Sequence, residues 1–233
     1  MQRGIVLTSL STVIALALGL VLGAHLPHQA APPSDSGDTA MPSPSVFADS
    51  TAPAPPANSV SVASQPDNFS LLYAACAVAQ SIREQDYAAL ASYVHPQQGV
   101  TFTPYSTVHP QEDLTFTAGQ IRDLANDETV YTWGFTDGKG APIQMTLEEY
   151  FAAYVFSTDY TQAPHLGIDQ IIMNGNALEN LAEAYPDCHF VDFCFPSLNS
   201  VNQGQDWCSL KVVFQTYQDT WKLVALVHGQ WTI

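Results

Sequence analysis

The last third of the chain is the feature that most constrains its fold. It holds three consecutive strand-like segments, HFVDFCF, LKVVFQTY and WKLVALVHGQWTI, which are rich in β-branched and aromatic residues. Only Gln218, Asp219 and Thr220 separate the second segment from the third, a length typical of a hairpin turn. Helical patterns prevail before them, and a sheet can bury an apolar face by packing against such helices. The sequence therefore predicts an α+β domain with N-terminal helices on a curved antiparallel sheet.

The closing segment, residues 221–233, is expected to be an inner strand of that sheet. Both of its faces are partly apolar, which indicates that other parts of the chain cover both. The polar members of one face gather toward the C-terminal end, and this predicts a pocket with a polar mouth. Strict alternation puts Trp221, Leu223, Ala225, Val227, Trp231 and Ile233 on one face and Lys222, Val224, Leu226, His228, Gln230 and Thr232 on the other.

Capping residues mark where the earlier helices are expected to begin. Asp67 is one of three residues that can cap the first helix, and Asp86 can cap the second. Thr117 and Thr146 each stand three residues before Gln or Glu, as in a capping box. Asn176 is expected to cap a short helix. Two further strands, TVYTWGF and APIQM, are expected to flank a turn at DGKG.

The N-terminal segment predicts a membrane contact. Residues 4–24 form a run of 21 residues without a charge, and a helix needs about 20 to cross a bilayer. Arg3 precedes the run and the next Lys or Arg is Arg83, which predicts that the remainder is exported. The run is long for a signal peptide and lacks a good small-residue cleavage site. A single N-terminal anchor over residues 1–24 is therefore favoured, and a cleaved signal with a secreted product is the alternative.

Residues 25–66 differ in composition from the C-terminal part of the chain. They hold nine of the chain's 16 prolines and no Lys or Arg, a composition that cannot bury enough apolar surface to offset chain entropy. A disordered linker is expected there, and one α+β extracytoplasmic domain is expected over residues 67–233. That domain carries nineteen Asp and Glu against five Lys and Arg. So acidic a surface excludes nucleic acid as a partner, and it is compatible with cations, polyamines, basic partners or simple solubility.

The domain contains four cysteines. Cys188 and Cys194 lie six residues apart in one expected strand, roughly 20 Å at about 3.3 Å per residue, which is too far to pair. If the loop of the preceding hairpin centres near Val201, Cys194 falls opposite Cys208, and this pair is the predicted disulfide. Cys76 lies on an alanine-rich helical stretch and is expected to be a buried thiol.

Signatures of common enzyme classes are missing from the sequence. It has no H-E-x-x-H motif, no G-x-S-x-G elbow, no P-loop and no dinucleotide fingerprint. His165 and Asp169 have no third ligand in view, and DGKG lacks the acidic ligands of a calcium loop. Neither a metal nor a cofactor is predicted. A Cys208–His228 thiol site and a His228–Asp192 acid–base pair are the catalytic alternatives that the residues leave open.

The candidates for a pocket lining are polar or amphipathic residues in otherwise apolar, strand-like settings. Each can equally be a hydrogen-bonded core or rim residue. Convergence of several on one cavity would favour a site for a small ligand or peptide. These candidates are His228, Gln230, Tyr105, His95, Trp133 and Asp192.

Three stretches carry a family resemblance: VTFTPY, YTWGFTDGKGAPIQMT and the closing WKLVALVHGQWTI. In them the chain resembles a group of exported or lipid-anchored bacterial proteins of unassigned function, over most of residues 95–233. No catalytic residue can be carried over from that group. More loosely, helices followed by a bent sheet resemble the NTF2-like (SnoaL-like, cystatin-like) cone, a fold that hosts enzymes, binders and inert modules. The extra segment at residues 117–185 departs from the simplest cone.

Three functions are compatible with these patterns. The favoured one is a non-catalytic cell-envelope binding or accessory module, whose polar-mouthed pocket takes an unknown small molecule or whose partner is an envelope protein. A pocket-histidine hydrolase or isomerase of the NTF2-like type is the first alternative. The second is a structural ectodomain that forms a homodimer through an open sheet face, as the cone resemblance implies.

Overall fold

A computed structural model describes residues 67–232, so the predicted anchor at residues 1–24 and linker at residues 25–66 lie outside the described part. Within residues 67–232, no helix is both long and apolar enough to span a bilayer. The helices are α1 (Asn68–Glu84), α2 (Tyr87–Tyr93), α3 (Ala118–Arg122), α4 (Leu147–Tyr150) and α5 (Leu181–Ala184), with short turns η1 (Leu124–Asn126), η2 (Phe151–Val155, π-helical), η3 (Tyr160–Gln162) and η4 (Ser200–Asn202). The strands are β1 (Val100–Thr103), β2 (Leu114–Phe116), β3 (Tyr131–Phe135), β4 (Pro142–Met145), β5 (His165–Ile168), β6 (His189–Phe195), β7 (Cys208–Tyr217) and β8 (Thr220–Gln230).

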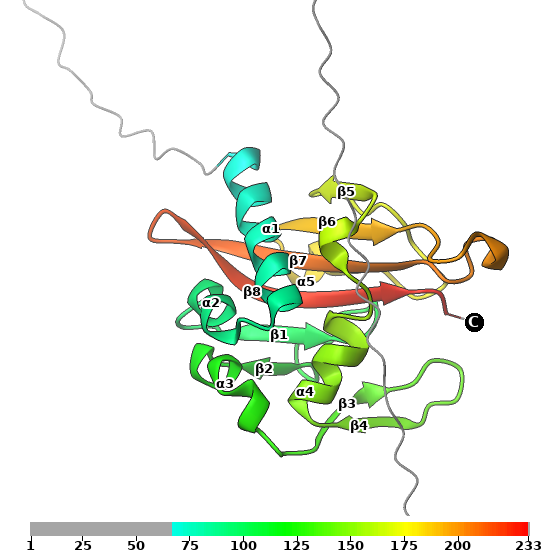
Figure 1. Cartoon of the computed structure of the whole chain (residues 1–233), viewed down its shortest axis with the longest axis horizontal. Coiled ribbons are helices and arrows are strands. Elements are labelled where there is room, and N and C mark those ends of the chain that lie inside the picture. Colours follow the sequence, from blue (N-terminus) through cyan, green and yellow to red (C-terminus); the bar gives the residue numbers. More distant parts are fainter. Residues whose placement is uncertain (1–66, 233) are drawn as a thin grey trace, which may run out of the picture. The chain divides into compact units, whose positions relative to one another are not determined.

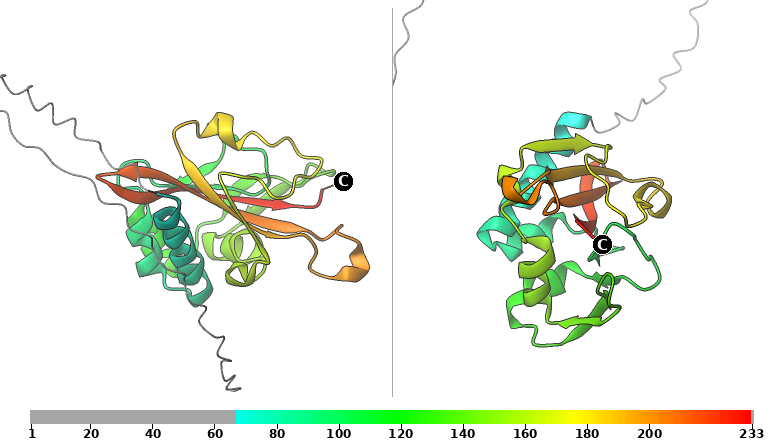
Figure 2. Two further views of the ribbon diagram at one scale, coloured as in Figure 1. Left: turned by 90° about the horizontal axis from the view of Figure 1, so that it is seen from above. Right: turned by 90° about the vertical axis from the view of Figure 1, so that its right-hand side faces the viewer.

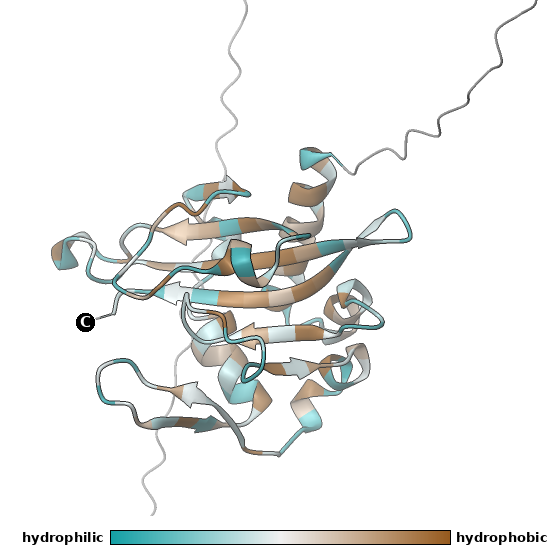
Figure 3. Ribbon diagram, turned by 180° about the vertical axis from the view of Figure 1, so that it is seen from behind, coloured by the Kyte–Doolittle hydropathy of each residue, from teal (hydrophilic) through white to brown (hydrophobic). Residues whose placement is uncertain are grey.

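Six of the strands form one sheet in the order β2-β1-β8-β7-β6-β5, and β3 pairs with β4 in a separate hairpin (Figure 1). The α+β class and the inner position of the closing strand are confirmed, because β8 lies between β1 and β7. The prediction of a purely antiparallel sheet is wrong, since β1 runs parallel to β8 with Phe102 beside Leu226. Hairpin signals are local, whereas this pairing joins segments at opposite ends of the domain. Hydrophobic residues run along β7 and β8 (Figure 3).

A β-bulge in β8 changes which residues share a face. Val213 pairs with Ala225 and Phe214 pairs with Leu223, so Val224 is an extra residue in β8. The predicted strict alternation is therefore wrong across the bulge. Trp221, Leu223 and Leu226 join the larger core under α1 to α4, whereas Val224, Ala225 and Val227 join a smaller core on the opposite face.

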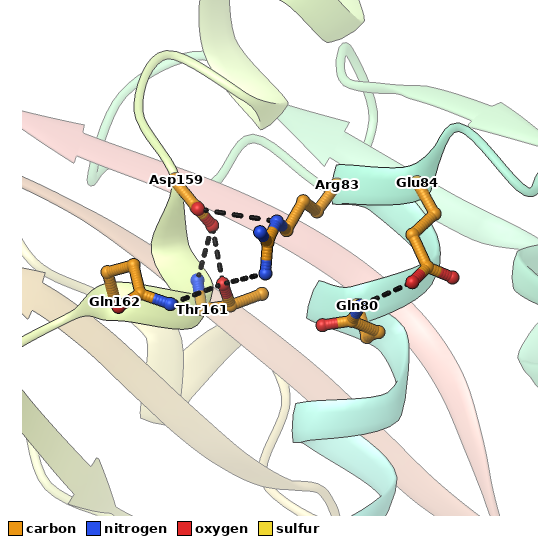
Figure 4. Close-up of polar contacts among 6 residues, drawn as sticks. All are labelled: Gln80, Arg83, Glu84, Asp159, Thr161 and Gln162. Carbon is orange, nitrogen blue, oxygen red and sulfur yellow. Dashed lines mark hydrogen bonds and ion pairs between the residues drawn. The ribbon is translucent and has the colours of Figure 1, made fainter. Parts of the chain in front are cut away.

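Helices cover the sheet on both faces, and its strands twist strongly (Figure 2). The N-terminal helix α1 packs against β6, β7 and β8. At its C-terminal end Arg83 forms an ion pair with Asp159 at 3.4 Å and hydrogen-bonds Thr161 at 3.5 Å, which ties α1 to η3 (Figure 4). The short helix α5 contributes Leu181 to the core of the other face.

The predicted helix starts are confirmed for the first four helices, whose N-caps are Asp67, Asp86, Thr117 and Thr146. Both threonines form complete capping boxes, with Gln120 and Glu149 respectively. The cap expected at Asn176 is wrong. Its side-chain amide donates to the carbonyl of Thr232 at 3.3 Å, and α5 begins only at Leu181.

Candidate functional site

A cavity of about 520 Å³ opens between the end of β1, the β3–β4 hairpin and the end of β8. We call it the hairpin pocket. It combines aromatic side chains, carboxylates and backbone of a glycine-rich turn, a mixture typical of sites that orient a small ligand. Its lining residues are Pro104, Tyr105, Thr107, His109, Glu112, Asp113, Trp133, Gly134, Phe135, Thr136, Asp137, Gly138, Gly140, Ala177 and Thr232.

The aromatic wall of the pocket is fixed by the core behind it. The Trp133 ring is buried and stacks on Tyr150 at a centroid distance of 3.8 Å and an interplanar angle of 19°. The Trp133 indole Nε1 donates to the carbonyl of Met145 at 2.9 Å, which holds the ring on its own hairpin. Tyr150 comes from α4, whose start is defined by the Thr146 capping box. The order of this wall therefore depends on the helical segment that starts at Thr146, α4 continued directly by η2.

Replacing Thr146 with alanine is expected to lower the free energy of unfolding by about 1 kcal/mol, because the amide of Glu149 loses its hydrogen-bond acceptor. Thr132→Ala is the matched control, since Thr132 is exposed on β3 and caps no helix. Urea unfolding followed by tryptophan fluorescence measures both variants. Equal losses in the two would contradict a specific capping role.

The predicted turn at DGKG joins β3 to β4 and forms one side of the pocket. The backbone amide of Gly140 donates to the carbonyl of Thr136 at 2.9 Å. The backbone amide of Asp137 donates to the Tyr105 hydroxyl at 3.4 Å, so the turn is linked to the end of β1. Gly134 has a φ of 115°, a conformation that L side chains rarely adopt. A Cβ at this position would meet only Pro104 Cγ, at 3.9 Å, so the backbone conformation rather than lack of space favours glycine.

Two adjacent carboxylates follow the exit of β1. Asp113 accepts hydrogen bonds at its Oδ2 from the Thr103 hydroxyl at 2.6 Å and from the His109 amide at 2.9 Å. Burial raises the pKa of Asp113, although these hydrogen bonds lower it in part. Glu112 is exposed. In the described part of the chain, neither Glu112 nor Asp113 forms an ion pair with lysine or arginine.

Ala177 lines the opposite side of the pocket, and hydrogen bonds join its segment, residues 176–180, to neighbouring parts of the chain. The Thr107 hydroxyl donates to the carbonyl of Leu178 at 2.7 Å. The Asn180 side chain accepts from the amide of Val108 at 2.8 Å and donates to its carbonyl at 3.0 Å. Thr232 closes the site from the chain just after β8. It is 6% exposed, and its buried Oγ1 has no hydrogen-bond partner.

A buried charge cluster anchors this wall to the sheet. Lys211 is fully buried, and its Nζ lies 3.3 Å from Glu179 Oε2, an ion pair without the geometry of a hydrogen bond. Asp192 stands directly opposite Lys211 on β6 and is also fully buried. Burial raises the pKa of Asp192, and Lys211 lowers it in part. A Cβ on Gly229 would lie 3.0 Å from the Lys211 ammonium, so glycine leaves room for the lysine.

The six residues predicted to line one pocket are distributed over several places. Tyr105 and Trp133 do line the hairpin pocket. Gln230 pairs with Cys208 at the end of β8 and is half-buried, but it does not line the pocket. His95 packs edge-to-face against Tyr217 with ring centroids 5.0 Å apart. Its Nδ1 accepts backbone amides of the following turn, so it is a structural residue there.

His228 is buried directly behind the pocket wall. It is 1% exposed, its Nδ1 lies 3.1 Å from the carbonyl oxygen of Pro104, and its Nε2 lies 3.3 Å from the Ser157 hydroxyl. Burial lowers the pKa of His228 to about 4, with a further contribution from Lys211. The ring is thus neutral at pH 7 and faces protein groups rather than the cavity.

The structure separates His228 from Asp192, its partner in the acid–base alternative. Asp192 and Lys211 share a face with Val227, whereas His228 follows Val227 along the strand and points to the other face. An acid–base pair of His228 with Asp192 is therefore wrong. The Cys208–His228 hypothesis has no support either, because burial raises the pKa of the Cys208 thiol.

The predicted disulfide is also wrong. Cys194 stands opposite Ser209, and Cys208 stands opposite Phe195, so the two cysteines lie on different faces of the sheet. All four cysteines of the described part are free. The expected loop centre near Val201 was half a residue off, and a one-residue slip of register exchanges the two faces. The expectation of a buried Cys76 is wrong as well, since this thiol is exposed.

Sequence reasoning missed the residues that build the walls of the pocket. Lys211 carried a signal, because a lone lysine inside the apolar run SLKVVF must either face solvent or find a buried partner. Glu179 carried none, because its ion pair with Lys211 joins residues far apart in the sequence.

Comparisons with known proteins give only distant neighbours. No family model and no curated protein sequence matches the chain. Among solved structures, the chain is similar to a variant of Rd1NTF2_05 with 11% identity and a TM-score of 0.30, covering 68% of this chain and 95% of that one. It is similar at 9% identity and a TM-score of 0.30 to a protein described as a calcium/calmodulin dependent protein kinase II association domain from Xanthomonas campestris, covering 70% of this chain and 84% of that one. An NTF-2 like protein of unknown function from Shewanella oneidensis MR-1 matches at 10% identity and a TM-score of 0.27, covering 69% of this chain and 94% of that one. At such TM-scores these neighbours carry no argument about the fold or the function of this chain.

Proposed function

We propose that the chain is a non-catalytic binding module of the cell envelope, held at the membrane by residues 4–24, whose hairpin pocket takes a small ligand. The location rests on the uncharged N-terminal run and on the absence of Lys and Arg between Arg3 and Arg83. The binding role rests on the pocket. A volume of about 520 Å³ is within the range of small-molecule sites.

The observation that carries this proposal is the mixed lining of the pocket. The rings of Trp133 and Tyr105 stand beside the carboxylates of Glu112 and Asp113 and the backbone of the glycine-rich turn. Apolar walls with a few polar groups are typical of cavities that bind and orient a small ligand.

A catalytic role finds less support in the geometry. The neutral His228 is enclosed by Pro104 and Ser157 and does not line the pocket. General acid–base catalysis requires a group within hydrogen-bond reach of the substrate. Among the residues that line the pocket, His109 is exposed on a loop, and no carboxylate of residues 67–232 orients its ring through a hydrogen bond. Binding without turnover therefore accounts best for the site.

The homodimer hypothesis is less favoured for a different reason. The sheet face opposite α1 is not open. Ile171, Leu181 and Tyr185 cover it by packing on the strand residues Val213 and Val227. A dimer built on that face would have to displace this cover. Dimerisation stays a prediction, and the pocket is the better-supported site of interaction.

Native mass spectrometry of the full chain, extracted in detergent from the envelope of its own host, tests the proposal. We expect a co-purifying small molecule on the wild-type protein and its loss from Ala177→Phe, which fills the pocket. Ala182→Phe is the matched control, since Ala182 is exposed on α5 and lines no part of this pocket. A bare wild-type protein, or a ligand retained by Ala177→Phe, would overturn the proposal.

A further inference from the structure

We propose that the outward face of α1 is a contact between two copies of this chain, whose α1 helices pack antiparallel about a two-fold axis at Cys76. The contact lies outside the hairpin pocket and goes beyond the proposed function. It also differs from a dimer through the sheet face, which other parts of the chain cover. Three features of α1 support it: an apolar outward face, the absence of charge on that face, and a gradient of side-chain size along it.

The outward face of α1 is apolar, whereas a surface helix normally presents polar side chains to water. Phe69 and Tyr73 are 77% and 69% exposed, and the Cys76 thiol is exposed as well. Residues three or four positions apart share one face of a helix. With their half-buried neighbours they form what we call the α1 stripe: Phe69, Leu72, Tyr73, Cys76, Ala77 and Gln80. A continuous exposed apolar surface of this kind is typical of contact with another molecule.

The charge of the chain favours a second copy as that molecule. The formal net charge is −16, so two copies repel each other over most of their surfaces. In contrast, α1 has no charged residue between Asn68 and Ile82. Two copies can therefore meet on the α1 stripe without placing like charges together. A basic partner protein would be attracted to the acidic surface elsewhere and would gain nothing from an uncharged stripe.

Side-chain size changes along the stripe in a way that makes it complementary to itself. The N-terminal half carries its three large apolar side chains, whereas the C-terminal half carries Ala77 and Gln80. A groove of about 220 Å³ opens beside that second half, between α1 and Leu166 of the edge strand β5. A two-fold contact uses the same patch on both copies. Antiparallel packing meets this requirement, because it places the large half of one helix against the small half of the other.

The register follows from the positions of these residues. With the two-fold axis at Cys76, Leu72 lies at the level of Gln80 of the second copy and therefore beside the groove. Phe69 lies at the level of Arg83 of the second copy. An arginine beside an aromatic face gains a cation–π attraction.

The charges at the two ends of α1 also favour the antiparallel arrangement. Asp67 caps the N-terminus, and Arg83 stands in the last turn. The Arg83 side chain is 46% exposed although it pairs with Asp159. Glu84 at the same end accepts a hydrogen bond from the Gln80 amide at 2.5 Å (Figure 4). Antiparallel packing brings the Arg83 end of each helix to the Asp67 end of the other, whereas parallel packing would bring each of these charges to its own copy.

The stripe is large enough for a weak dimer. An aromatic side chain buries about 150–250 Å², so the two exposed rings of each copy supply on the order of 600 Å² together before their neighbours are added. Interfaces below about 1,200 Å² are typical of weak or transient complexes. The proposed membrane anchor would hold the copies in one membrane and raise their effective concentration.

Cross-linking of the full chain in membranes of its own host tests the contact, with a short bis-maleimide that joins two thiols. We expect a covalent dimer from the wild type and none from Cys76→Ser. Cys76→Ser/Asn68→Cys should give none either, because antiparallel helices centred on residue 76 hold these two thiols about 24 Å apart. A dimer from Asn68→Cys as abundant as that from Cys76 would indicate random collision or parallel helices, and would overturn the inference.

A double substitution tests whether the stripe itself holds the copies together. Phe69→Ser/Tyr73→Ser should lower the initial rate of cross-linking at Cys76 at least about fivefold, because the buried apolar area is lost. Val130→Ser/Val201→Ser is the matched control, since these side chains are 64% and 79% exposed outside the stripe. Urea unfolding verifies that both variants stay folded. Equal rates in the two variants would overturn the inference.

The wild-type result is decisive in each case. If no covalent dimer forms and a mono-maleimide labels Cys76 fully, the stripe is open to water and the inference is wrong. If no dimer forms and Cys76 is protected from labelling, another occupant covers the stripe, such as lipid or a different protein, and the inference is equally wrong. Neither result affects the proposed binding module, whose test detects a small molecule rather than a dimer.

Discussion

Replacing Lys211 with methionine is expected to lower the free energy of unfolding by about 3–5 kcal/mol, because the change leaves two carboxylates inside the protein without their cation. Asp192 is fully buried, and the Glu179 carboxylate lies 3.3 Å from the Lys211 ammonium. Methionine fills a similar volume, so the loss reflects charge rather than a cavity. Lys222→Met is the matched control, since Lys222 is half-buried and its ammonium donates to the carbonyl of Ser92.

The pH dependence of this loss has a defined sign. Burial raises the pKa of Asp192 in the folded state, and removing Lys211 raises it further. A raised carboxyl pKa means that the folded state holds its proton more tightly than the unfolded state does, so folding is favoured at acidic pH and disfavoured above the folded pKa. The deficit of Lys211→Met should therefore shrink as the pH falls. Urea unfolding at several pH values measures it.

A compensated variant distinguishes unpaired charge from other damage. Lys211→Met/Asp192→Asn/Glu179→Gln removes all three charges together, and most of the lost stability should return at pH 7. A triple variant no more stable than Lys211→Met would contradict the electrostatic explanation. Because Glu179 stands two residues after Ala177, which lines the pocket, Lys211→Met should also weaken the binding of a ligand in that pocket.

The sequence predicted those parts of the fold that depend on neighbouring residues. Period-2 patterns located β6, β7 and β8, and polar caps located the starts of α1 to α4. Partly apolar residues on both faces of the closing segment placed β8 inside the sheet. Two of the errors came from single-residue details: the bulge at Val224 and the half-residue shift of the loop near Val201. Each moved side chains to the other face, which no periodicity could show.

The candidate site was predictable only in part, for the same physical reason. Tyr105 and Trp133 were identified because they are amphipathic residues in strand-like stretches. The pocket itself forms where the β3–β4 hairpin, residues 176–180 and the end of β8 meet. These segments are far apart in the chain. His228 was an understandable misassignment, because a polar residue in an apolar strand indicates either a site or a hydrogen-bonded core position.

The pH dependence of stability that comes from His228 is the second large expected effect. Measuring it tests whether this histidine is a core residue. Its folded pKa of about 4 lies below the ordinary value of 6.5. Between these values the unfolded chain binds a proton that the folded state refuses, so the stability present above pH 6.5 is lost as the pH falls toward 4. A shift of this size corresponds to about 3 kcal/mol. Two neighbouring groups also act on the pKa of His228: Lys211 lowers it, and the hydrogen bond with the Pro104 carbonyl raises it.

His228→Gln isolates this contribution from the carboxylates that titrate in the same range. Glutamine can still donate to the Pro104 carbonyl, yet it takes up no proton. The stability difference between wild type and His228→Gln should therefore move in favour of the variant by about 3 kcal/mol between pH 7 and pH 4. His165→Gln, on an exposed edge strand, should leave the pH profile unchanged. Parallel profiles for wild type and His228→Gln would mean that the ring is accessible to protons in the folded state, and the pocket-histidine enzyme would again be a serious alternative.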